Sequence, residues 1–345
     1  MERHLRPSLS SMLCTVVLAS TFVFGYSDTA WTAAQSSGKP APLTPDEFKK
    51  RLVGPILVIP TPFKADLSID HAAVRRMIEG ALKHESKVVA LTAGDSKYDV
   101  LSEEEIRALT RTIVEATGCR GLTIGAAGRW KLKEGETVEQ VVNDVISYAE
   151  FAESVGVSGL QVLLPGELSE DDYVRHYGEI ARRTRLPIVL HGNFSESLLK
   201  RLTAFPTIAA LKEDISLQYL IDRLIVFGDR LVIFPGGAES RYLVAYPYGC
   251  QAYYTVMYQY APALGQEFWR MVRQGKLREA GDFVRKYEHP LMSRFTHGLW
   301  HAALEYFGVA PRFLRPPYET MKESELDEVK RLFDAMGLTA TPSPR

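Results

Sequence analysis

From residue 52 onward, short apolar runs alternate with longer amphipathic stretches. Each run contains four to six β-branched or other apolar residues and is bounded by Gly, Pro or polar residues. Apolar and polar positions do not alternate within a run, which predicts strands that are buried on both faces, as in a parallel sheet. The eight runs are residues 54–60, 87–93, 121–127, 159–164, 187–192, 207–212, 231–236 and 251–256.

The stretches between the runs carry helix start and stop signals. Ser68 is the expected N-cap of a helix over residues 68–84, and Ser102 pairs with Glu105 as a capping box. Ser169 begins another helix in the same way, with acids in its first turn and arginines in its last. The other helical segments are residues 137–156 and 216–228, which end on glycine, and residues 261–275, 277–295 and 323–337, which follow the last run.

Eight predicted strands, with helical segments between and after them, indicate an α/β fold, namely a (β/α)8 TIM barrel with extra C-terminal helices. A doubly wound sheet is the alternative, but the count of eight and the even spacing favour a closed barrel. No break occurs between residues 45 and 338, so we expect a single barrel domain over residues 45–345. Its C-terminal helical extension is expected over about residues 262–338.

The N-terminal residues do not follow this pattern. Positive residues precede the apolar stretch Met12–Tyr26, and small residues follow it, which is the order of a secretory signal. Cleavage after Ala34 or Ala30 predicts a signal peptide over residues 1–34 and a flexible linker over residues 35–44. The mature protein is then periplasmic or extracellular, without stable membrane insertion. An uncleaved anchor, or a misassigned start codon on a cytoplasmic protein, is the alternative.

The composition argues against several classes of function. The formal net charge is -1 and there is no long basic run, so nucleic acid is not an expected partner. The three cysteines, Cys14, Cys119 and Cys250, form no disulfide framework. No CxxC, HExxH or clustered His/Cys spacing indicates a metal, and no glycine-rich nucleotide loop is present. We therefore expect neither a metal nor an organic cofactor.

Lys212 is unusual because the apolar strand in "AALKEDIS" (209–216) leads directly into it. Chemistry in such barrels lies at the C-terminal ends of the strands, so this side chain can point into the barrel mouth. Desolvation there disfavours the charged form and lowers the pKa, and a neutral amine can attack a ketone to form a Schiff base. The structural alternative is that Lys212 extends to solvent and pairs with Glu213 or Asp214.

A second candidate follows the second run, in "ALTAGDSKYDVLSEEE" (90–105). Its turn Thr92–Ala93–Gly94–Asp95 offers backbone N–H groups, one hydroxyl, and a glycine that allows a ligand to approach. These features suit a small carboxylate. Taken alone, however, the stretch is more typical of an ordinary loop between a strand and a helix.

Together, these stretches resemble the dihydrodipicolinate synthase / N-acetylneuraminate lyase family of pyruvate-dependent class I aldolases, over about residues 50–340. "GPILVIPTPFKADLSIDHAAVRRMIE" is similar to the family's opening strand, its T-P-F turn and the lead into its first helix. "LTAGDSKYDVLSEEE" resembles the G-[ST]-T-G-E … L-S-x-E-E block, and "IAALKED" resembles the I-x-G-I-K-[ED] lysine strand. "FPGGAESRYLVAYPYGCQAYYTVMYQYAP" and "YFGVAPRFLRPPYETMKESELDEVKRLFDAMGL" resemble the last two segments of the family pattern.

The resemblance implies that Lys212 is the Schiff-base lysine. It also implies that the backbone N–H groups of Thr92 and Ala93 hold the carboxylate of bound pyruvate, in a substrate-binding turn that Gly94 and Asp95 complete. The family's pair of hydroxyl residues is broken here, since Ala93 supplies an N–H but no hydroxyl.

The family's relay tyrosine is missing. The family usually has a P-x-Y-Y-type block after strand four, whereas this chain has "VLLPGELSEDDY", with Leu-Pro-Gly at the matching residues 164–166. Tyr98, Tyr254 and His191 are the candidate replacements. His191, at the end of the fifth run, has the best chain position and an unperturbed pKa near neutral, although a lone histidine is more often structural.

Three functions remain open at this point. The first is a Schiff-base lyase or aldolase acting on pyruvate or a related 2-oxo acid, and the second is a dehydratase or decarboxylase of a sugar-acid-derived 2-oxo acid on the same lysine. The third is an exported, catalytically degenerate protein that binds a small acid. The retained Lys212 favours the first two, whereas Ala93 and the missing tyrosine favour the third. The resemblance further implies a homo-oligomer, either a tetramer or a dimer.

Overall fold

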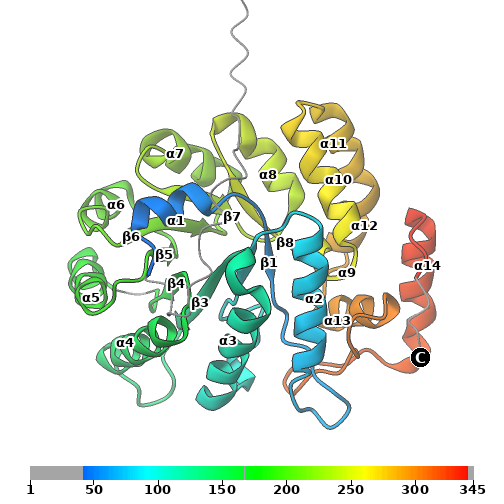
Figure 1. The fold of residues 1–345 in the computed structure, drawn as a ribbon, viewed down its shortest axis with the longest axis horizontal. Coiled ribbons are helices and arrows are strands. Elements are labelled where there is room, and N and C mark those ends of the chain that lie inside the picture. The colour runs from blue at the N-terminus through cyan, green and yellow to red at the C-terminus, as the bar shows by residue number, and fades with distance from the viewer. Residues whose placement is uncertain (1–41, 167, 341–345) are drawn as a thin grey trace, which may run out of the picture. The chain divides into compact units, whose positions relative to one another are not determined.

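The computed structural model describes residues 42–166 and 168–340, which form a barrel of eight parallel strands surrounded by helices (Figure 1). Hydrogen bonds join the strands in the order β7-β6-β5-β4-β3-β2-β1-β8, and β7 also contacts β8. The strands are β1 (Gly54–Val58), β2 (Val88–Ala90), β3 (Leu122–Gly128), β4 (Gly159–Leu163), β5 (Ile188–His191), β6 (Ile208–Glu213), β7 (Val232–Pro235) and β8 (Ala252–Thr255). Each lies within or next to one of the eight apolar runs, which confirms the expected fold class.

Helices follow the strands and cover the outside of the barrel (Figure 1). They are α2 (His71–Lys83), α3 (Glu103–Thr117), α4 (Val138–Val155), α5 (Glu170–Arg183), α6 (Glu196–Leu202), α7 (Leu217–Phe227) and α8 (Glu239–Ala245). Ser102 and Glu105 form the expected capping box, and the Ser169 hydroxyl accepts the N–H of Asp172. These side chains satisfy N–H groups that have no partner within the helix.

The barrel interior is closed at its N-terminal end by α1 (Pro45–Arg51). Phe48 and Leu52 of this segment belong to the same apolar cluster as the inward-facing strand residues. Phe48 packs against Gly159 at the start of β4, where an added Cβ would come within 2.5 Å of the ring. The opposite end of the barrel, at the carboxyl ends of the strands, is therefore the end that can receive a ligand.

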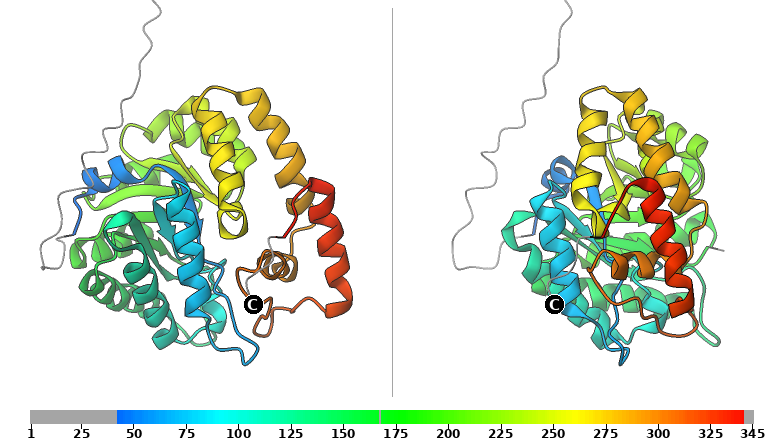
Figure 2. Two further views of the ribbon diagram at one scale, coloured as in Figure 1. Left: turned by 45° about the vertical axis from the view of Figure 1, so that its right-hand side comes forward. Right: turned by 90° about the vertical axis from the view of Figure 1, so that its right-hand side faces the viewer.

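The C-terminal helices lie together along one side of the barrel, in yellow to red in Figure 2. They are α9 (Met257–Tyr260), α10 (Pro262–Arg273), α11 (Leu277–Phe283), α12 (His289–Met292), α13 (His297–Tyr306) and α14 (Leu326–Met336). Within residues 42–166 and 168–340, no helix is long and apolar enough to cross a membrane.

Two expected boundaries are wrong. α2 begins after Asp70, whose carboxylate accepts the N–H of Ala73 at 2.9 Å, and Ser68 instead donates to Asp66. β6 continues through Glu213, so Lys212 is the penultimate residue of its strand.

The short helices α1, α6 and α8 were not expected. Each has seven residues, about two turns, which is too short for an apolar period to become visible in the sequence. The expected signal peptide over residues 1–34, and most of the expected linker, lie outside the described residues.

Candidate active site

Lys212 enters the barrel interior because side chains along a strand point alternately to opposite faces. Ala210 belongs to the interior cluster, whereas Leu211 belongs to the cluster between the sheet and the helices. Lys212 therefore faces inward with Ala210, and only 6% of its side chain is exposed. The lysine does not extend to solvent.

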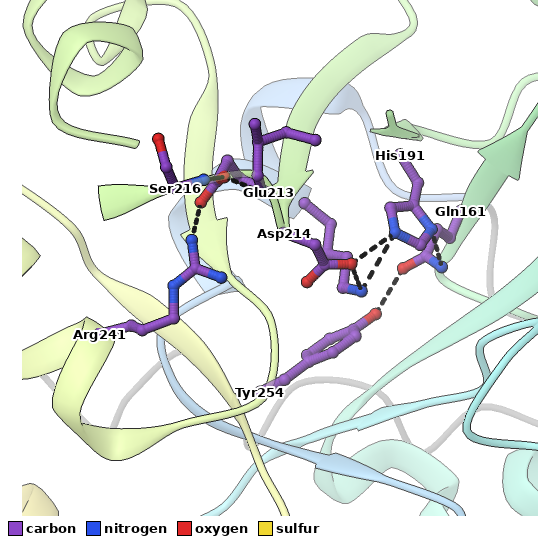
Figure 3. Close-up of polar contacts among 9 residues, drawn as sticks. Gln161, His191, Glu213, Asp214, Ser216, Arg241 and Tyr254 are labelled. Carbon is purple, nitrogen blue, oxygen red and sulfur yellow. Dashed lines mark hydrogen bonds and ion pairs between the residues drawn. The ribbon is translucent and has the colours of Figure 1, made fainter. Parts of the chain in front are cut away.

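Two side chains that Figure 3 labels, His191 and Asp214, meet the Lys212 amine. Its Nζ forms an ion pair with the Asp214 carboxylate and lies 3.1 Å from Nε2 of His191. Nε2 of His191 also lies 2.9 Å from Oδ2 of Asp214, so the three groups form a closed triangle. His191 is opposite Lys212 in the β5–β6 pairing, which explains the close approach. An imidazole and a carboxylate are thus both at hydrogen-bond distance from the amine.

The other nitrogen of His191 is also held. Nε2 of Gln161 lies 3.2 Å from Nδ1 of His191, and the Tyr254 hydroxyl donates to Oε1 of Gln161 at 2.5 Å. Gln161 comes from β4 and Tyr254 from β8, and both side chains are buried. The Lys212 amine lies 5.3 Å from the centroid of the Tyr254 ring. A hydrogen-bonded chain therefore crosses the barrel from Tyr254 through Gln161 and His191 to Lys212.

The electrostatics of the triangle distinguish its acid from its base. Burial lowers the pKa of His191, and the charge of Lys212 lowers it further, against the opposing effect of Asp214. Removal from water raises the pKa of the Asp214 carboxyl, but the hydrogen bond from His191 and the charge of Lys212 outweigh this and hold that pKa well below its usual range. At neutral pH, His191 is therefore a neutral base and Asp214 is a carboxylate.

Each tautomer of neutral His191 satisfies one of the two neighbours of Nε2. With the proton on Nε2, the ring donates to Asp214 and accepts the Gln161 amide N–H at Nδ1. With the proton on Nδ1, Nε2 accepts from the Lys212 amine but meets the Asp214 carboxylate without a proton between them, and the Gln161 amide is turned over so that Tyr254 accepts its N–H. The second tautomer leaves a lone pair directed at the amine, which is the arrangement that removes a proton from Lys212.

Glu213 takes no part in this triangle, although it is next to both partners in sequence. Its carboxylate points away from the barrel interior, accepts the N–H of Ser216 at 2.8 Å and pairs with Arg241 of α8 (Figure 3). Burial raises the pKa of Glu213, and the Arg241 charge only partly offsets this effect. Of the two acids that follow Lys212, only Asp214 is its partner.

Two further residues shape the space around the amine. A Cβ added at Gly236 would lie 1.9 Å from Oδ1 of Asp214 and 2.9 Å from Cε of Lys212, so only glycine leaves room for the ion pair. The Trp130 ring, from the loop after β3, meets the His191 ring edge-on with centroids 4.8 Å apart. Trp130 therefore covers the imidazole on the solvent side, and Trp130 itself is 44% exposed.

The expected substrate-binding turn follows β2 directly. The N–H of Thr92 already donates to Oγ of Ser96 at 3.1 Å. Among the hydrogen bonds of the described residues, none uses the N–H of Ala93 or Gly94 as its donor. The turn thus presents the N–H groups of Ala93 and Gly94, one residue later than the expected pair. Asp95 is partly exposed, and its charge acts on His191 and Tyr254.

Tyr98 lies outside the network. Burial raises the pKa of its hydroxyl well above the usual value, and the neighbouring hydroxyl of Tyr148 raises it further. The ring lines a cavity of about 540 Å³ next to α3 and α4, which also reaches Ala93, Gly94 and Trp130. Within the described parts of the chain, Tyr98 makes no hydrogen bond to Lys212 or His191. The fold therefore brings His191 and Tyr254 to Lys212, but not Tyr98.

Residues 51–336 match the Dihydrodipicolinate synthetase family, which is most of the chain. The chain belongs to this family. The expected resemblance is therefore confirmed, and with it the expected enzyme class, a Schiff-base-forming (class I) lyase or aldolase.

Relatives and solved structures agree with this assignment. An uncharacterized DapA-like lyase of Thermococcus kodakarensis is 28% identical over 297 residues, which cover 81% of this chain and 97% of the relative. A probable 5-dehydro-4-deoxyglucarate dehydratase of Ralstonia nicotianae is 27% identical over 319 residues, which cover 86% and 99%. A prophage protein of the dihydrodipicolinic acid synthase family from E. coli, solved in complex with pyruvate, has the same fold, with a TM-score of 0.73 at 19% identity and coverage of 83% and 99%.

This member of the dihydrodipicolinate synthetase family carries residues that the sequence analysis missed, namely Gln161, Trp130 and Gly236. Gln161 was visible as a polar residue inside the apolar run "GLQVLL", and buried polar side chains in strands require partners. Trp130 and Gly236 gave no local signal, because their roles depend on residues from other strands.

Among the described residues, no three His, Cys, Asp or Glu side chains gather in a way that could hold a metal ion.

Proposed function

We propose that Lys212 forms a Schiff base with a 2-oxo acid such as pyruvate, and that His191 moves the protons for this step. The observation that carries the proposal is the 3.1 Å approach of the Lys212 amine to Nε2 of a neutral, buried His191. Asp214 keeps its negative charge beside the amine and stabilises the cationic nitrogen of the ammonium and of the imine.

The reaction begins when His191 accepts a proton from the Lys212 ammonium. The free amine then attacks the ketone carbon, and a proton moves from nitrogen to oxygen to give a neutral carbinolamine. Protonated His191 returns its proton to the hydroxyl, which leaves as water, and the nitrogen becomes a protonated imine. His191, neutral again, then takes a proton from the carbon next to the imine to give an enamine, which forms a C–C bond or, in reverse, results from breaking one.

Borohydride trapping tests this proposal. Pyruvate with borohydride is expected to add one reduced adduct per chain, and peptide mass spectrometry is expected to locate it on Lys212. An unmodified Lys212 peptide, or label on another residue, contradicts the mechanism.

The second candidate is dehydration or decarboxylation of a sugar-acid-derived 2-oxo acid on the same lysine. The 27% identity to a probable 5-dehydro-4-deoxyglucarate dehydratase over 86% of this chain favours it. A panel of 2-oxo acids, followed by product analysis, distinguishes the candidates: a lyase releases pyruvate or consumes it, whereas a dehydratase releases water and a decarboxylase releases CO2, and neither of these produces pyruvate by cleaving the chain. A small-acid-binding protein would bind without turnover, as Ala93 and the absent tyrosine suggested.

We do not expect efficient dihydrodipicolinate synthesis. Leu164 is packed in the outer apolar cluster, and the Tyr173 hydroxyl donates to the Pro165 carbonyl at 2.8 Å, so the loop after β4 carries no relay tyrosine. General acid–base help is typically worth about 10²–10⁴-fold. Condensation of pyruvate with aspartate semialdehyde at a rate normal for the family would contradict this expectation.

We also propose that the mature protein begins near Gln35 outside the cytoplasm, and that it is a dimer or tetramer. The apolar stretch Met12–Tyr26 followed by Ala34 supports export. N-terminal sequencing of the native protein that returns Met1 would contradict export, and a monomeric mass in solution would contradict the oligomer.

A further inference from the structure

A second lysine, Lys97, is buried in the turn that follows β2. None of its surface is exposed, and its backbone has a φ of 58°, which is strained for a residue other than glycine. Its Nζ donates to the carbonyl of Asp95 at 3.0 Å. Within the described parts of the chain, no carboxylate oxygen lies within 4.0 Å of this nitrogen. A buried ammonium without an ion pair costs stability, so its retention needs an explanation.

The surroundings of Lys97 come from its own loop and from the C-terminal helices. The amine lies 5.0 Å from the centroid of the Trp300 ring and 5.1 Å from that of the Tyr318 ring. The titratable and charged groups that face it are Asp95 and Asp99 of its own loop, His297 and His301 of α13, and Tyr318. Both ring nitrogens of the fully buried His301 lack a hydrogen-bond partner.

Lys97 also determines the shape of the turn. Its backbone N–H donates to the Gly94 carbonyl at 3.0 Å, and its amine holds the Asp95 carbonyl. The backbone N–H of the next residue, Tyr98, donates to the Ala93 carbonyl at 3.0 Å. These bonds draw the carbonyl oxygens of the turn toward Lys97 and Tyr98, and the N–H groups of Ala93 and Gly94 have no acceptor among the described residues.

This turn faces the same barrel mouth as Lys212. The charge of Asp95 acts on His191 and Tyr254, and it also acts on Lys97 and Tyr318. The Asp95 carboxylate is therefore near enough to influence both the Lys212 triangle and the Lys97 environment. An anion bound by the Ala93 and Gly94 N–H groups would lie in the field of a buried ammonium that contacts no carboxylate oxygen directly and whose charge Asp95 and Asp99 offset only from a distance.

We propose that Lys97 is a positioning residue that sets the affinity for the 2-oxo acid, because it orders the turn and supplies the positive charge behind the bound carboxylate. This inference rests on the proposed function, since it assumes that the Lys212 substrate places its carboxylate on this turn. Lys97 forms no bond with the reacting carbon. Its loss should therefore weaken binding and leave the chemistry at Lys212 intact.

The experiment measures the rate of borohydride trapping on Lys212 against pyruvate concentration, by intact-mass spectrometry. Lys97→Met removes the charge at similar length, and Lys97→Arg keeps a charge that does not titrate below pH 12. Lys330→Met, on the exposed face of α14, is the matched control. We expect Lys97→Met to raise the half-saturating pyruvate concentration about tenfold or more, with little change in the rate at saturation.

The pH dependence separates a charge effect from a purely structural one. Burial lowers the pKa of Lys97 to about 8, although Asp95 and Asp99 oppose this shift. Lys97 loses its charge as the pH rises through this value, whereas the arginine in Lys97→Arg keeps its charge. We therefore expect the half-saturating pyruvate concentration of the wild-type protein, divided by that of Lys97→Arg, to rise between pH 7 and pH 9.5. Effects of His191 and Lys212 are common to both proteins and cancel in this ratio.

A half-saturating concentration in Lys97→Met equal to that of the wild-type protein would overturn the proposal, as would a ratio to Lys97→Arg that stays constant with pH. If Lys97→Met fails to fold, the Lys97→Arg ratio decides alone. Absence of any adduct in the wild-type protein at saturating pyruvate refutes the proposed function instead, so the two failures are distinguishable.

Discussion

Two buried lysines lie at the mouth of this barrel, and their partners differ. Lys212 meets a carboxylate and a neutral imidazole, both within hydrogen-bond distance, and the imidazole is held in turn by Gln161. Lys97 meets one backbone carbonyl and the faces of two aromatic rings.

The difference shows why burial alone does not make a lysine a nucleophile. A nucleophilic amine must lose a proton during the reaction, and Lys212 has a base to receive it. Lys97 has no such acceptor among its neighbouring side chains in the described chain, except for histidines whose pKa values its own charge lowers. The first environment supports covalent chemistry, and the second supports a fixed charge.

The largest effect that would break this comparison is the loss of the adduct. We expect Lys212→Met to lower the rate of borohydride trapping of pyruvate by about 10³-fold or more, because the nucleophile is removed. Lys97→Met should still be trapped at saturating pyruvate. Mass spectrometry of both variants checks this, and a trapped adduct in Lys212→Met would assign the chemistry to another amine.

The role of His191 is the next test. We expect His191→Phe to slow trapping and turnover by about 10²-fold, while an adduct on Lys212 still forms at long times. The ring keeps its contact with Trp130, but the base is lost. Full activity in His191→Phe would show that the histidine is structural, and Tyr254→Phe and Tyr98→Phe would then be the variants to measure.

Gly236 tests whether the Lys212–Asp214 geometry matters. The Cβ added by Gly236→Ala would overlap the Lys212–Asp214 ion pair and force the two side chains apart. We therefore expect the trapping rate to fall about tenfold. Gly281→Ala is the matched control, since a Cβ at that helix position meets nothing within 4 Å. Equal rates in both variants would mean that the ion pair tolerates displacement.

The smallest expected effect concerns stability. The pKa of Lys97 falls from 10.5 to about 8 on folding because of burial. Between these values the unfolded chain binds more protons than the folded one, so the contribution of Lys97 to stability rises as pH increases from 8 to 10.5. We expect the stability of the wild-type protein relative to Lys97→Met to rise by about 1–3 kcal/mol over this window.

Denaturant unfolding of both proteins at several pH values measures this change, with Lys330→Met as the control. A stability difference that is flat from pH 8 to pH 10.5 would mean that Lys97 titrates as it does in water. The Lys97 ammonium would then be better solvated than its buried contacts imply.

Sequence reasoning located the strands and the buried Lys212 because both signals are local. An apolar run of four to six residues is visible without knowledge of the fold, and so is the lysine that interrupts one of them. The sequence also indicates which of Glu213 and Asp214 is the partner of Lys212. Alternation along a strand places residues 212 and 214 on one face and residue 213 on the other.

By itself, then, the sequence determined the (β/α)8 class, the family pattern and Lys212 at the carboxyl end of β6, since each depends on neighbours along the chain. Only the tertiary structure decided the partners. Closure of the barrel brings Tyr254 to Gln161, 93 residues away, and Gln161 to His191, and packing of α13 against the barrel places Trp300 over Lys97. Hydrogen bonds and cation–π contacts depend on distances of a few ångströms between residues far apart in sequence, and only the folded chain sets those distances.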